Sequence, residues 1–183
     1  MREPMSLHEI VLPITKPETE WILGRAVRKV SPFRTHALLQ ATICNALSHW
    51  AKGRGEVGPE WRFRIAPPGE VRRPLVPDIA FVSHARLDAL EGLDLELPPF
   101  APDVAVEILS PGWRRRHLEH KIGVYLAGGS ALVVVVDPPQ RTVQLHDADG
   151  TRTLRDDDVL AHAAVPEFAL PLRELFAVLE RRR

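Results

Sequence analysis

The most constraining feature of this sequence is an unbroken apolar run, Ala131 to Val136, which follows Gly128-Gly129 and precedes Asp137-Pro138-Pro139. A run of this length is too short to cross a bilayer, and its valine content is typical of a central strand buried on both faces of a sheet. Such a strand needs a layer of structure above it and another below it. We therefore expect helices packed around one sheet.

Two further segments have the pattern of strands that pack beside this run. Each begins with a Pro-Asp pair, and they span residues 77–82 and 102–109. Apolar residues recur at helical spacing over 34–52 and 113–127, so these segments are expected to be helices. Shorter predicted elements are a hairpin at 21–30 around Gly24, an alternating strand at 61–65, a helix at 84–91, a strand at 142–146 and a helix at 171–180. This order predicts a mixed α/β (α+β) fold, with a mixed central sheet flanked by helices.

The length of 183 residues suits one domain, and no repeat or low-complexity linker divides the chain. We expect an N-terminal arm at residues 1–20, which is polar and broken by prolines, and a single domain at residues 21–183. The N-terminus lacks the apolar segment of a secretory signal. The single cysteine, Cys44, excludes an internal disulfide. The sequence thus predicts a cytoplasmic protein without a membrane partner.

The charge balance limits the partners of the chain. The sequence has 24 Lys and Arg residues and 24 Asp and Glu residues, so its formal net charge is +0. A wholly basic nucleic-acid-binding domain is therefore not supported, although a local patch is compatible with this balance. Arg114, Arg115 and Arg116 are the best candidates for nucleic-acid contact, because guanidinium groups bind phosphate through paired hydrogen bonds. A solvated helix start explains these three arginines equally well.

Carboxylates on two of the predicted strands indicate a hydrolytic metal site. Side-chain alternation places Asp103 and Glu107 on one face of their strand, about 13 Å apart at roughly 3.3 Å per residue, which is too far to share one ion. Asp78 can lie beside Glu107 if the two strands pair. Such a pair supplies the hard oxygen ligands that Mg²⁺ or Mn²⁺ prefers, and it leaves positions for water and phosphate.

A lysine follows these carboxylates on the next predicted helix. Lys121 is one of only four lysines in the chain. It shares a helical stripe with His117 and Tyr125, which lie four residues to either side. If this helix crosses the strand ends, the Lys121 ammonium can face the attacking water or the scissile phosphate and offset developing negative charge. Asp, Glu, Lys and a divalent metal together are typical of phosphodiester hydrolases.

Structural explanations exist for the same residues. Asp78 and Asp103 each follow a proline, so either side chain can cap a turn. Glu107 interrupts an apolar strand, and a buried glutamate needs a partner. One of the arginines at 114–116 can provide that partner as a structural salt bridge. For Lys121 a structural role stays open as well.

Several segments of the chain, taken together, resemble one family. These segments are 76–82, 101–111, 121–125, 128–129, 134–138 and 165–171. They are similar to the Uma-type putative restriction endonuclease family, which belongs to the PD-(D/E)XK nuclease superfamily. The resemblance extends from about Trp21 to Phe176 and implies a restriction-endonuclease-like core.

The resemblance also implies roles for individual residues. Asp78 corresponds to the motif aspartate and Glu107 to the motif acid. The usual Glu-x-Lys spacing would place the lysine at position 109, where this chain has Leu109. Lys121 matches the displaced lysine of the family, and Tyr125 is expected to be a secondary site residue.

The beginning of the chain has one match to the family and one departure from it. His36 matches the histidine that opens the first helix of the family, which makes it a second secondary site residue. The family often has a glutamate ahead of this helix. Here Gly24 is followed by Arg25, and the departure weakens the expected metal site.

The sequence therefore predicts a metal-dependent endonuclease that hydrolyses DNA phosphodiester bonds. Asp78 and Glu107 are expected to bind Mg²⁺ (or Mn²⁺), and Lys121 to position water or stabilise charge. A homodimer or higher even oligomer suits cleavage of both strands of a duplex. Two alternatives stay open: a nuclease fold that binds nucleic acid without cutting it, and a homo-oligomeric structural protein whose exposed Trp and Leu residues form the interface. The presence of all three charged groups favours the enzyme over the first alternative.

Overall fold

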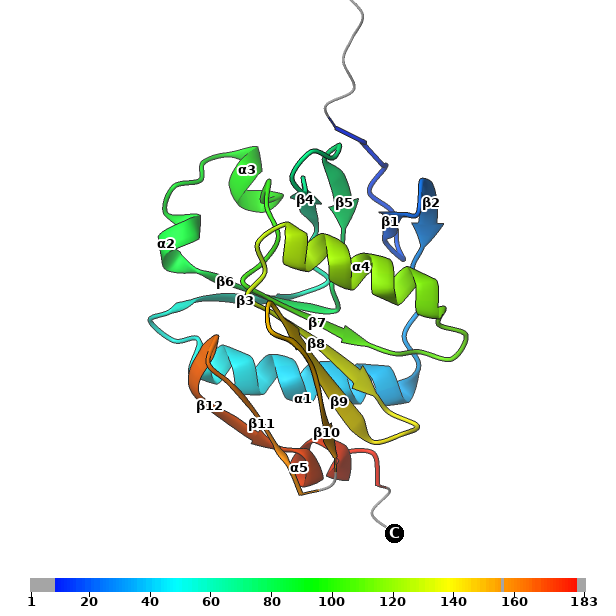
Figure 1. Ribbon diagram of the computed structural model, residues 1–183, viewed down its shortest axis with the longest axis vertical. Coiled ribbons are helices and arrows are strands. Elements are labelled where there is room, and N and C mark those ends of the chain that lie inside the picture. The colour runs from blue at the N-terminus through cyan, green and yellow to red at the C-terminus, as the bar shows by residue number, and fades with distance from the viewer. Residues whose placement is uncertain (1–8, 156, 181–183) are drawn as a thin grey trace, which may run out of the picture.

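A computed structural model describes residues 9–155 and 157–180 (Figure 1). Its helices are α1 (Arg34–Trp50), α2 (His84–Leu87), α3 (Leu93–Glu96), α4 (Arg115–Ala127) and α5 (Leu172–Ala177). Its strands are β1 (Thr19–Ile22), β2 (Arg25–Arg28), β3 (Gly55–Pro59), β4 (Phe63–Ile65), β5 (Arg73–Leu75), β6 (Ile79–Ser83), β7 (Val104–Ile108), β8 (Leu132–Asp137), β9 (Thr142–Asp147), β10 (Gly150–Arg155), β11 (Val159–His162) and β12 (Val165–Pro171). No helix in these two ranges is long and apolar enough to span a membrane.

Within the described residues the central sheet has six strands in the order β10-β9-β8-β7-β6-β3. Only β7 and β8 in this sheet run parallel, and α4 connects them. The apolar run that dominates the sequence becomes β8, whose first five residues are buried. The expectation of a mixed central sheet flanked by helices is confirmed.

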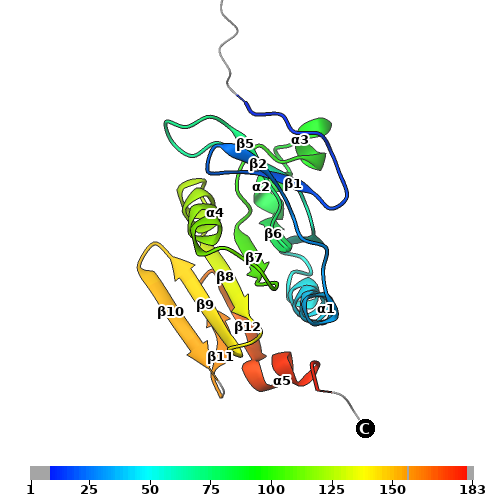
Figure 2. The same cartoon turned by 90° about the vertical axis from the view of Figure 1, so that its right-hand side faces the viewer.

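The two faces of the sheet pack against different elements, because side chains alternate along each strand. On one face, Val104, Val106 and Ile108 of β7 join an apolar core with α1 and α5. On the other face, Ala105 of β7 packs with Tyr125 of α4 and with residues of β4 and β5. Figure 2 shows α1 and α4 nearly end-on, on opposite sides of β7 and β8. Glu107 belongs to the α4 face, and this places a carboxylate under that helix.

The β1–β2 hairpin confirms the prediction of a hairpin around Gly24, although it begins at Thr19, two residues earlier. Leu23 and Gly24 both have positive φ, 50° and 77°, as a two-residue type I′ turn requires. The hairpin contacts α4 and β5 beside the sheet. Of the arm expected at residues 1–20, the first eight residues lie outside the described residues. Its later part packs on the domain, where the Ile10 amide donates to the Arg72 carbonyl at 2.8 Å.

The edge strand β3 was not predicted, because its sequence, Gly-Glu-Val-Gly-Pro, lacks the alternation and β-branched content of a strand. It pairs antiparallel with β6. A Cβ at Gly55 would lie 2.2 Å from the Val82 carbonyl oxygen, so glycine permits this close approach. Two predicted helices are also shorter than expected. The segment 84–91 forms only α2, and the segment 171–180 forms α5 after Pro171.

Candidate active site

Asp78 and Glu107 come together because β6 and β7 pair antiparallel. The register joins Ile79 with Val106, which brings the preceding Asp78 to the level of Glu107. The Ile108 amide donates to Asp78 Oδ2 at 2.7 Å. The two carboxyl side chains are buried, with 3% and 7% of Asp78 and Glu107 exposed. The strand pairing on which the predicted metal site depended is therefore present.

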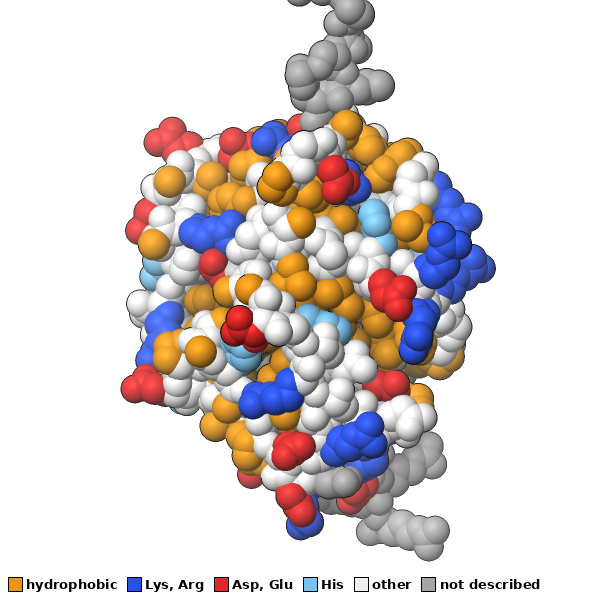
Figure 3. Space-filling view, viewed as in Figure 1, with side chains coloured by type: hydrophobic (Ala, Val, Ile, Leu, Met, Phe, Trp, Pro, Cys, Tyr) orange, Lys and Arg blue, Asp and Glu red, His pale blue; other side chains and the backbone are white. Residues whose placement is uncertain are grey.

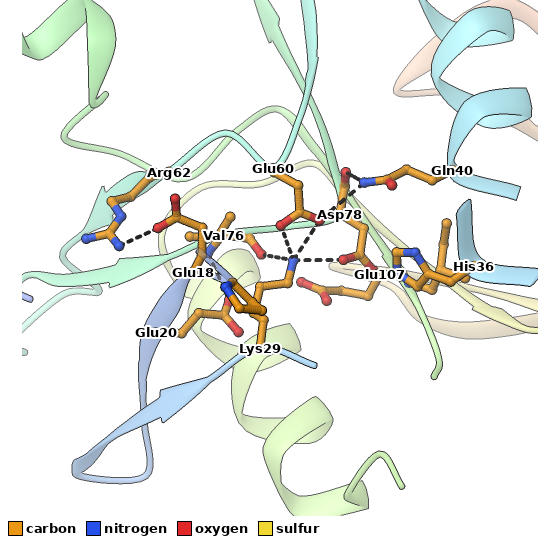
Figure 4. A network of polar contacts seen from close by, with 12 residues as sticks. Glu18, Glu20, Lys29, His36, Gln40, Glu60, Arg62, Val76, Asp78 and Glu107 are labelled. Atoms are coloured by element: carbon orange, nitrogen blue, oxygen red, sulfur yellow. Dashed lines mark hydrogen bonds and ion pairs between the residues drawn. The ribbon is translucent and has the colours of Figure 1, made fainter. Parts of the chain in front are cut away.

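Asp78 lies between two cationic or titratable groups from the N-terminal part of the chain. Lys29 Nζ is 2.8 Å from Asp78 Oδ1, and His36 Nε2 is 3.1 Å from Asp78 Oδ2. Figure 4 shows Lys29 and His36 on opposite sides of the carboxyl group. Burial alone would raise the pKa of Asp78, but Lys29 and then His36 outweigh burial and hold this pKa well below its usual range. Asp78 is thus ionised at neutral pH.

Glu107 has a different environment. Tyr125 donates its hydroxyl hydrogen to Glu107 Oε1 at 2.9 Å, and Lys121 Nζ lies 2.6 Å from the same oxygen. Burial raises the pKa of Glu107 to about 7, since the opposing effect of Lys121 is smaller and the charge of Asp78 adds to the rise. The two neighbouring carboxyl groups therefore differ: one is held ionised and the other titrates near neutral pH.

Lys121 and Tyr125 lie one turn apart on α4, and both reach Glu107. Lys121 Nζ also lies 2.8 Å from Glu20 Oε1. Burial would lower the pKa of Lys121, but Glu107 and Glu20 outweigh it and raise this pKa, so the ammonium stays charged. His117 belongs to the same predicted stripe, but its side chain contacts the hairpin instead of Glu107. Its Nε2 lies 3.2 Å from Arg25 Nη2 in the hairpin.

Lys29 is a site residue that the sequence analysis did not identify. Its Nζ donates to Asp78 Oδ1, to the Val76 carbonyl at 2.9 Å and to Glu60 at 3.2 Å. Burial would lower the pKa of Lys29, but Asp78 and the other carboxylates raise it far above its ordinary value. The only signal in the sequence was the rarity of lysine, which does not distinguish this residue from the other three.

Glu20 is a second residue of the candidate site that the sequence did not reveal. The departure at Arg25 suggested that the site lacks a glutamate from the beginning of the chain. The structure corrects this, because Glu20 of β1 is 3% exposed and accepts the Val76 amide at 2.9 Å. With its ion pair to Lys121, it adds a buried carboxylate to the site from the opposite strand of the same hairpin.

The arginines at 114–116 do not pair with Glu107, so the alternative of a structural salt bridge with them is wrong. Lys121 is the partner of Glu107, whereas the three arginines are exposed at the start of α4. Arg115 lies 3.9 Å from Glu119 of its own helix. Asp103 also lies outside the site. Its carboxylate accepts a hydrogen bond from the Ser83 amide and forms an ion pair with Arg86.

The buried charges open into a cleft of about 540 Å³. Asp78, Glu107 and Lys121 lie in its lining, together with Lys29 and His36. Its outer residues include exposed arginines from the hairpin and from the start of α4, which are Arg25, Arg28 and Arg114. Figure 3 shows Lys and Arg side chains gathered along the right-hand edge of the molecule, where Figure 1 places the hairpin and the start of α4. A rim of exposed arginines above an interior of paired carboxylates and lysines suits a phosphate chain that approaches the cleft.

The donor atoms fit a magnesium-like ion only in part. Asp78 and Glu107 offer the hard oxygen atoms that such an ion prefers, and Mg²⁺ commonly binds through one or two carboxylates while water and phosphate complete its shell. In residues 9–155 and 157–180, no three His, Cys, Asp or Glu side chains form a ready-made metal cluster. The Lys29 ammonium already contacts Asp78 Oδ1. An ion at this site would therefore share Asp78 with Lys29.

Comparisons with known proteins find a family and a solved structure that are similar to this chain. A model of the family Uma2, described as putative restriction endonuclease, matches residues 10–173. The structure is similar to that of a putative nuclease belonging to DUF820 from Anabaena variabilis ATCC 29413, with a TM-score of 0.80 and 25% sequence identity over 92% of this chain and 95% of that chain. No curated protein matches the chain. The expected restriction-endonuclease-like fold class is confirmed.

Proposed function

The chain belongs to the Uma2 family of putative restriction endonucleases, and from this premise we propose that it is a metal-dependent endonuclease that hydrolyses DNA phosphodiester bonds. The observation that carries the proposal is the meeting of Asp78 and Glu107 on paired strands, beside the buried Lys121, in one cleft. Carboxylates and a lysine in this arrangement supply cation binding and charge stabilisation, two contributions to phosphodiester hydrolysis.

The rim of the cleft binds the substrate. Arg114, exposed at the start of α4, faces the same cleft as Arg25 and Arg28 of the hairpin. Guanidinium groups accept no hydrogen bonds and donate to phosphate in pairs, so these residues hold the DNA backbone above the carboxylates. Arg115 and Arg116 extend the basic surface along the outer side of the helix.

In the interior of the cleft, Asp78 and Glu107 would hold Mg²⁺ or Mn²⁺. Such an ion supplies Lewis acidity toward the phosphate and lowers the pKa of water when it is bound. His36 and the Ile108 amide orient Asp78 from one side, and Tyr125 orients Glu107 through its hydroxyl hydrogen. His36 and Tyr125 are therefore positioning residues. The low pKa of Asp78 keeps one ligand anionic at every pH near neutrality.

Lys121 stabilises charge rather than removing a proton. Its pKa is raised by Glu107 and Glu20, so it is protonated at neutral pH and cannot act as a base. Two carboxylates fix the ammonium in the cleft at 2.6 and 2.8 Å. A fixed ammonium offsets the negative charge that develops on the phosphate without reorganising during the reaction.

The test is cleavage of supercoiled plasmid and of single-stranded DNA with Mg²⁺, Mn²⁺ or EDTA. The variants Asp78→Asn, Glu107→Gln and Lys121→Met keep the size of each side chain. Asp88→Asn, Glu119→Gln and Lys52→Met change exposed residues outside the cleft and serve as matched controls. We expect metal-dependent nicking in the parent and in the controls, and its loss in the three site variants. Nicking that survives in folded site variants would contradict the proposal and indicate a contaminant.

A second candidate is a nuclease fold that binds nucleic acid without cutting it. One observation favours it: the Lys29 ammonium donates to an oxygen of Asp78 that a metal ion would need. This candidate requires DNA binding without cleavage and a melting temperature that Mn²⁺ does not change. A rise in melting temperature with Mn²⁺ that disappears in Asp78→Asn would exclude it.

We extend the proposal to the state and compartment of the enzyme. A homodimer or higher even oligomer would provide one centre for each strand of a duplex. A sedimentation experiment in which the active protein is monomeric would contradict this part of the proposal. The free Cys44 supports action in the reducing cytoplasm.

A further inference from the structure

A second hollow, of about 480 Å³, adjoins the cleft that holds Asp78 and Glu107. Its walls are mostly apolar, and seven of the lining residues are aromatic residues, prolines or leucines: Phe33, Leu109, Pro111, Trp113, Pro138, Pro139 and Leu179. Its lining includes no Asp, Glu, Lys or Arg. A concave, mostly apolar site of this size is typical of small-molecule binding, and its few polar side chains are Thr35, His36 and Ser110.

The apolar hollow is continuous with the cleft. His36, Leu109 and Trp113 line both spaces. His36 also contacts Asp78 through Nε2 at 3.1 Å, so the boundary between the two spaces lies beside a proposed metal ligand. A nucleotide whose phosphate lies in the cleft can therefore extend into the hollow without crossing a wall between two separate spaces.

Two aromatic side chains of the hollow are exposed. Phe33, at the start of α1, is 57% exposed, and Trp113, in the loop before α4, is 45% exposed. In the part of the chain that the structure describes, neither ring packs against another aromatic ring. Large exposed rings beside a binding cleft mark a contact surface. The flat faces of these rings can stack on a planar partner. Every nucleobase has such a planar face, so stacking does not depend on the base sequence.

From this arrangement we infer that the hollow binds an unpaired nucleobase of the strand whose phosphate lies in the cleft. The inference rests on the proposed function and narrows its substrate to a single strand, or to a duplex in which one base has left the helix at the cleaved strand. A base within a duplex is stacked on both sides and paired, so it cannot enter a hollow in the protein unless it leaves the helix. The charged cleft takes the phosphate, and the uncharged hollow takes the base.

The experiment measures binding of fluorescently labelled DNA by anisotropy in EDTA, so that no cleavage occurs. Three probes are compared: a short single strand, the same strand with abasic sites, and a blunt duplex. The protein is tested as parent, Phe33→Ala, Trp113→Ala and the conservative Trp113→Phe. Leu93→Ala removes an exposed apolar side chain of α3 that does not line the hollow, and it is the matched control.

We expect the parent to bind the intact single strand about tenfold more tightly than the abasic strand, the size of one stacked base. Trp113→Ala and Phe33→Ala should lose most of this ratio, whereas Trp113→Phe and Leu93→Ala should keep it. The dissociation constant of the abasic strand should not change in any of these variants. Equal affinity for intact and abasic strands, or an unchanged ratio in both alanine variants, would overturn the inference.

The plasmid assay separates this inference from the proposed function. If the parent nicks DNA but the ratio of affinities is one, the hydrolytic function stands and the base-binding hollow is refuted. If the ratio is present and depends on Trp113 while no metal produces cleavage, the hollow stands and the hydrolytic function is refuted.

Discussion

Lys29 and Lys121 are two lysines that each contact one carboxylate of the β6–β7 pair, Asp78 and Glu107 respectively. They differ in how many of their ammonium hydrogens the protein already binds. An ammonium group has three hydrogens to donate. Lys29 donates to three oxygen atoms, on Asp78, Glu60 and Val76. In the described residues, Lys121 Nζ has two oxygen partners, one on Glu20 and one on Glu107. Lys29 is saturated by the protein, whereas Lys121 retains a hydrogen for another acceptor.

This difference suggests that Lys29 has a structural role and that Lys121 has a catalytic one. Lys29 follows β2 and neutralises a carboxyl group whose pKa is well below its usual range, so its partner is always charged. Lys121 faces Glu107, whose pKa is raised to about 7 and which can accept a proton instead. We infer that the fold depends more on Lys29 and that catalysis depends more on Lys121.

The largest expected effect concerns stability. Lys29→Met leaves Asp78 and Glu60 without their cation, and breaking a buried ion pair in this way costs about 3–5 kcal/mol. Lys121→Met should cost less, because Glu107 can become protonated. Urea unfolding of both variants measures the two losses. An equal or larger loss in Lys121→Met would break the comparison.

The next effect concerns rate. Lys121→Met should lower cleavage by about 10²–10³-fold, the usual result of removing one group that stabilises developing charge. Lys29→Met should keep most of the parent rate at a temperature where the variant is folded, since Lys29 has no free hydrogen. Initial rates of plasmid nicking, with Lys52→Met as an exposed lysine control, test the difference. Similar losses in both variants would assign catalysis to the two lysines jointly.

Metal binding should sharpen the comparison further. A ligand at 100 times its dissociation constant stabilises a protein by about 2.7 kcal/mol. A divalent cation can replace the lost ammonium beside Asp78 in Lys29→Met, so Mn²⁺ should raise the melting temperature of this variant more than that of the parent. Addition of Asp78→Asn should abolish the difference. A shift no larger than in the parent would mean that Lys29 does not compete with the ion.

The smallest expected effect concerns the ionisation of Tyr125, which lies beside Lys121 in the site. Tyr125, the one tyrosine of the chain, is buried and its pKa is well above the ordinary value, first because of burial and then because of Glu107 and Glu20. A raised folded-state pKa contributes stability that is fully present below the unfolded pKa of about 10 and is lost as pH rises toward the folded pKa. Absorbance at alkaline pH should therefore show tyrosinate only when circular dichroism shows unfolding. Ionisation well before unfolding would contradict this placement.

Local patterns in the sequence were enough to predict the part of the site that the central sheet carries. The Pro-Asp strands and the apolar run predict β6, β7 and β8, and alternation along β7 identifies Glu107 as unusual. Helical spacing then predicts that Lys121 and Tyr125 share one face of α4. The structure confirms these placements of elements, whereas the catalytic roles stay predictions.

The rest depended on contacts that no local pattern reveals. Lys29 contacts Val76 and Asp78 at sequence separations of 47 and 49 residues. Glu20 reaches Lys121 only because the hairpin packs against α4. A hairpin pattern predicts the turn at Gly24, but it carries no information about which other element the hairpin packs on. The glycine-rich β3 was missed for a similar reason, since pairing with β6 rather than strand propensity makes it a strand.

The position of the β1–β2 hairpin has a consequence for the timing of biosynthesis. The hairpin leaves the ribosome early, yet an isolated hairpin is marginally stable at best in water. Glu20 pairs with Lys121, and Lys29, just after β2, pairs with Asp78. Both partners are synthesised later, so Glu20 and Lys29 can both take their places only after most of the chain has emerged. A nascent or prematurely ended chain therefore lacks the assembled centre. The proposed nuclease centre would therefore form only late in the synthesis of the chain.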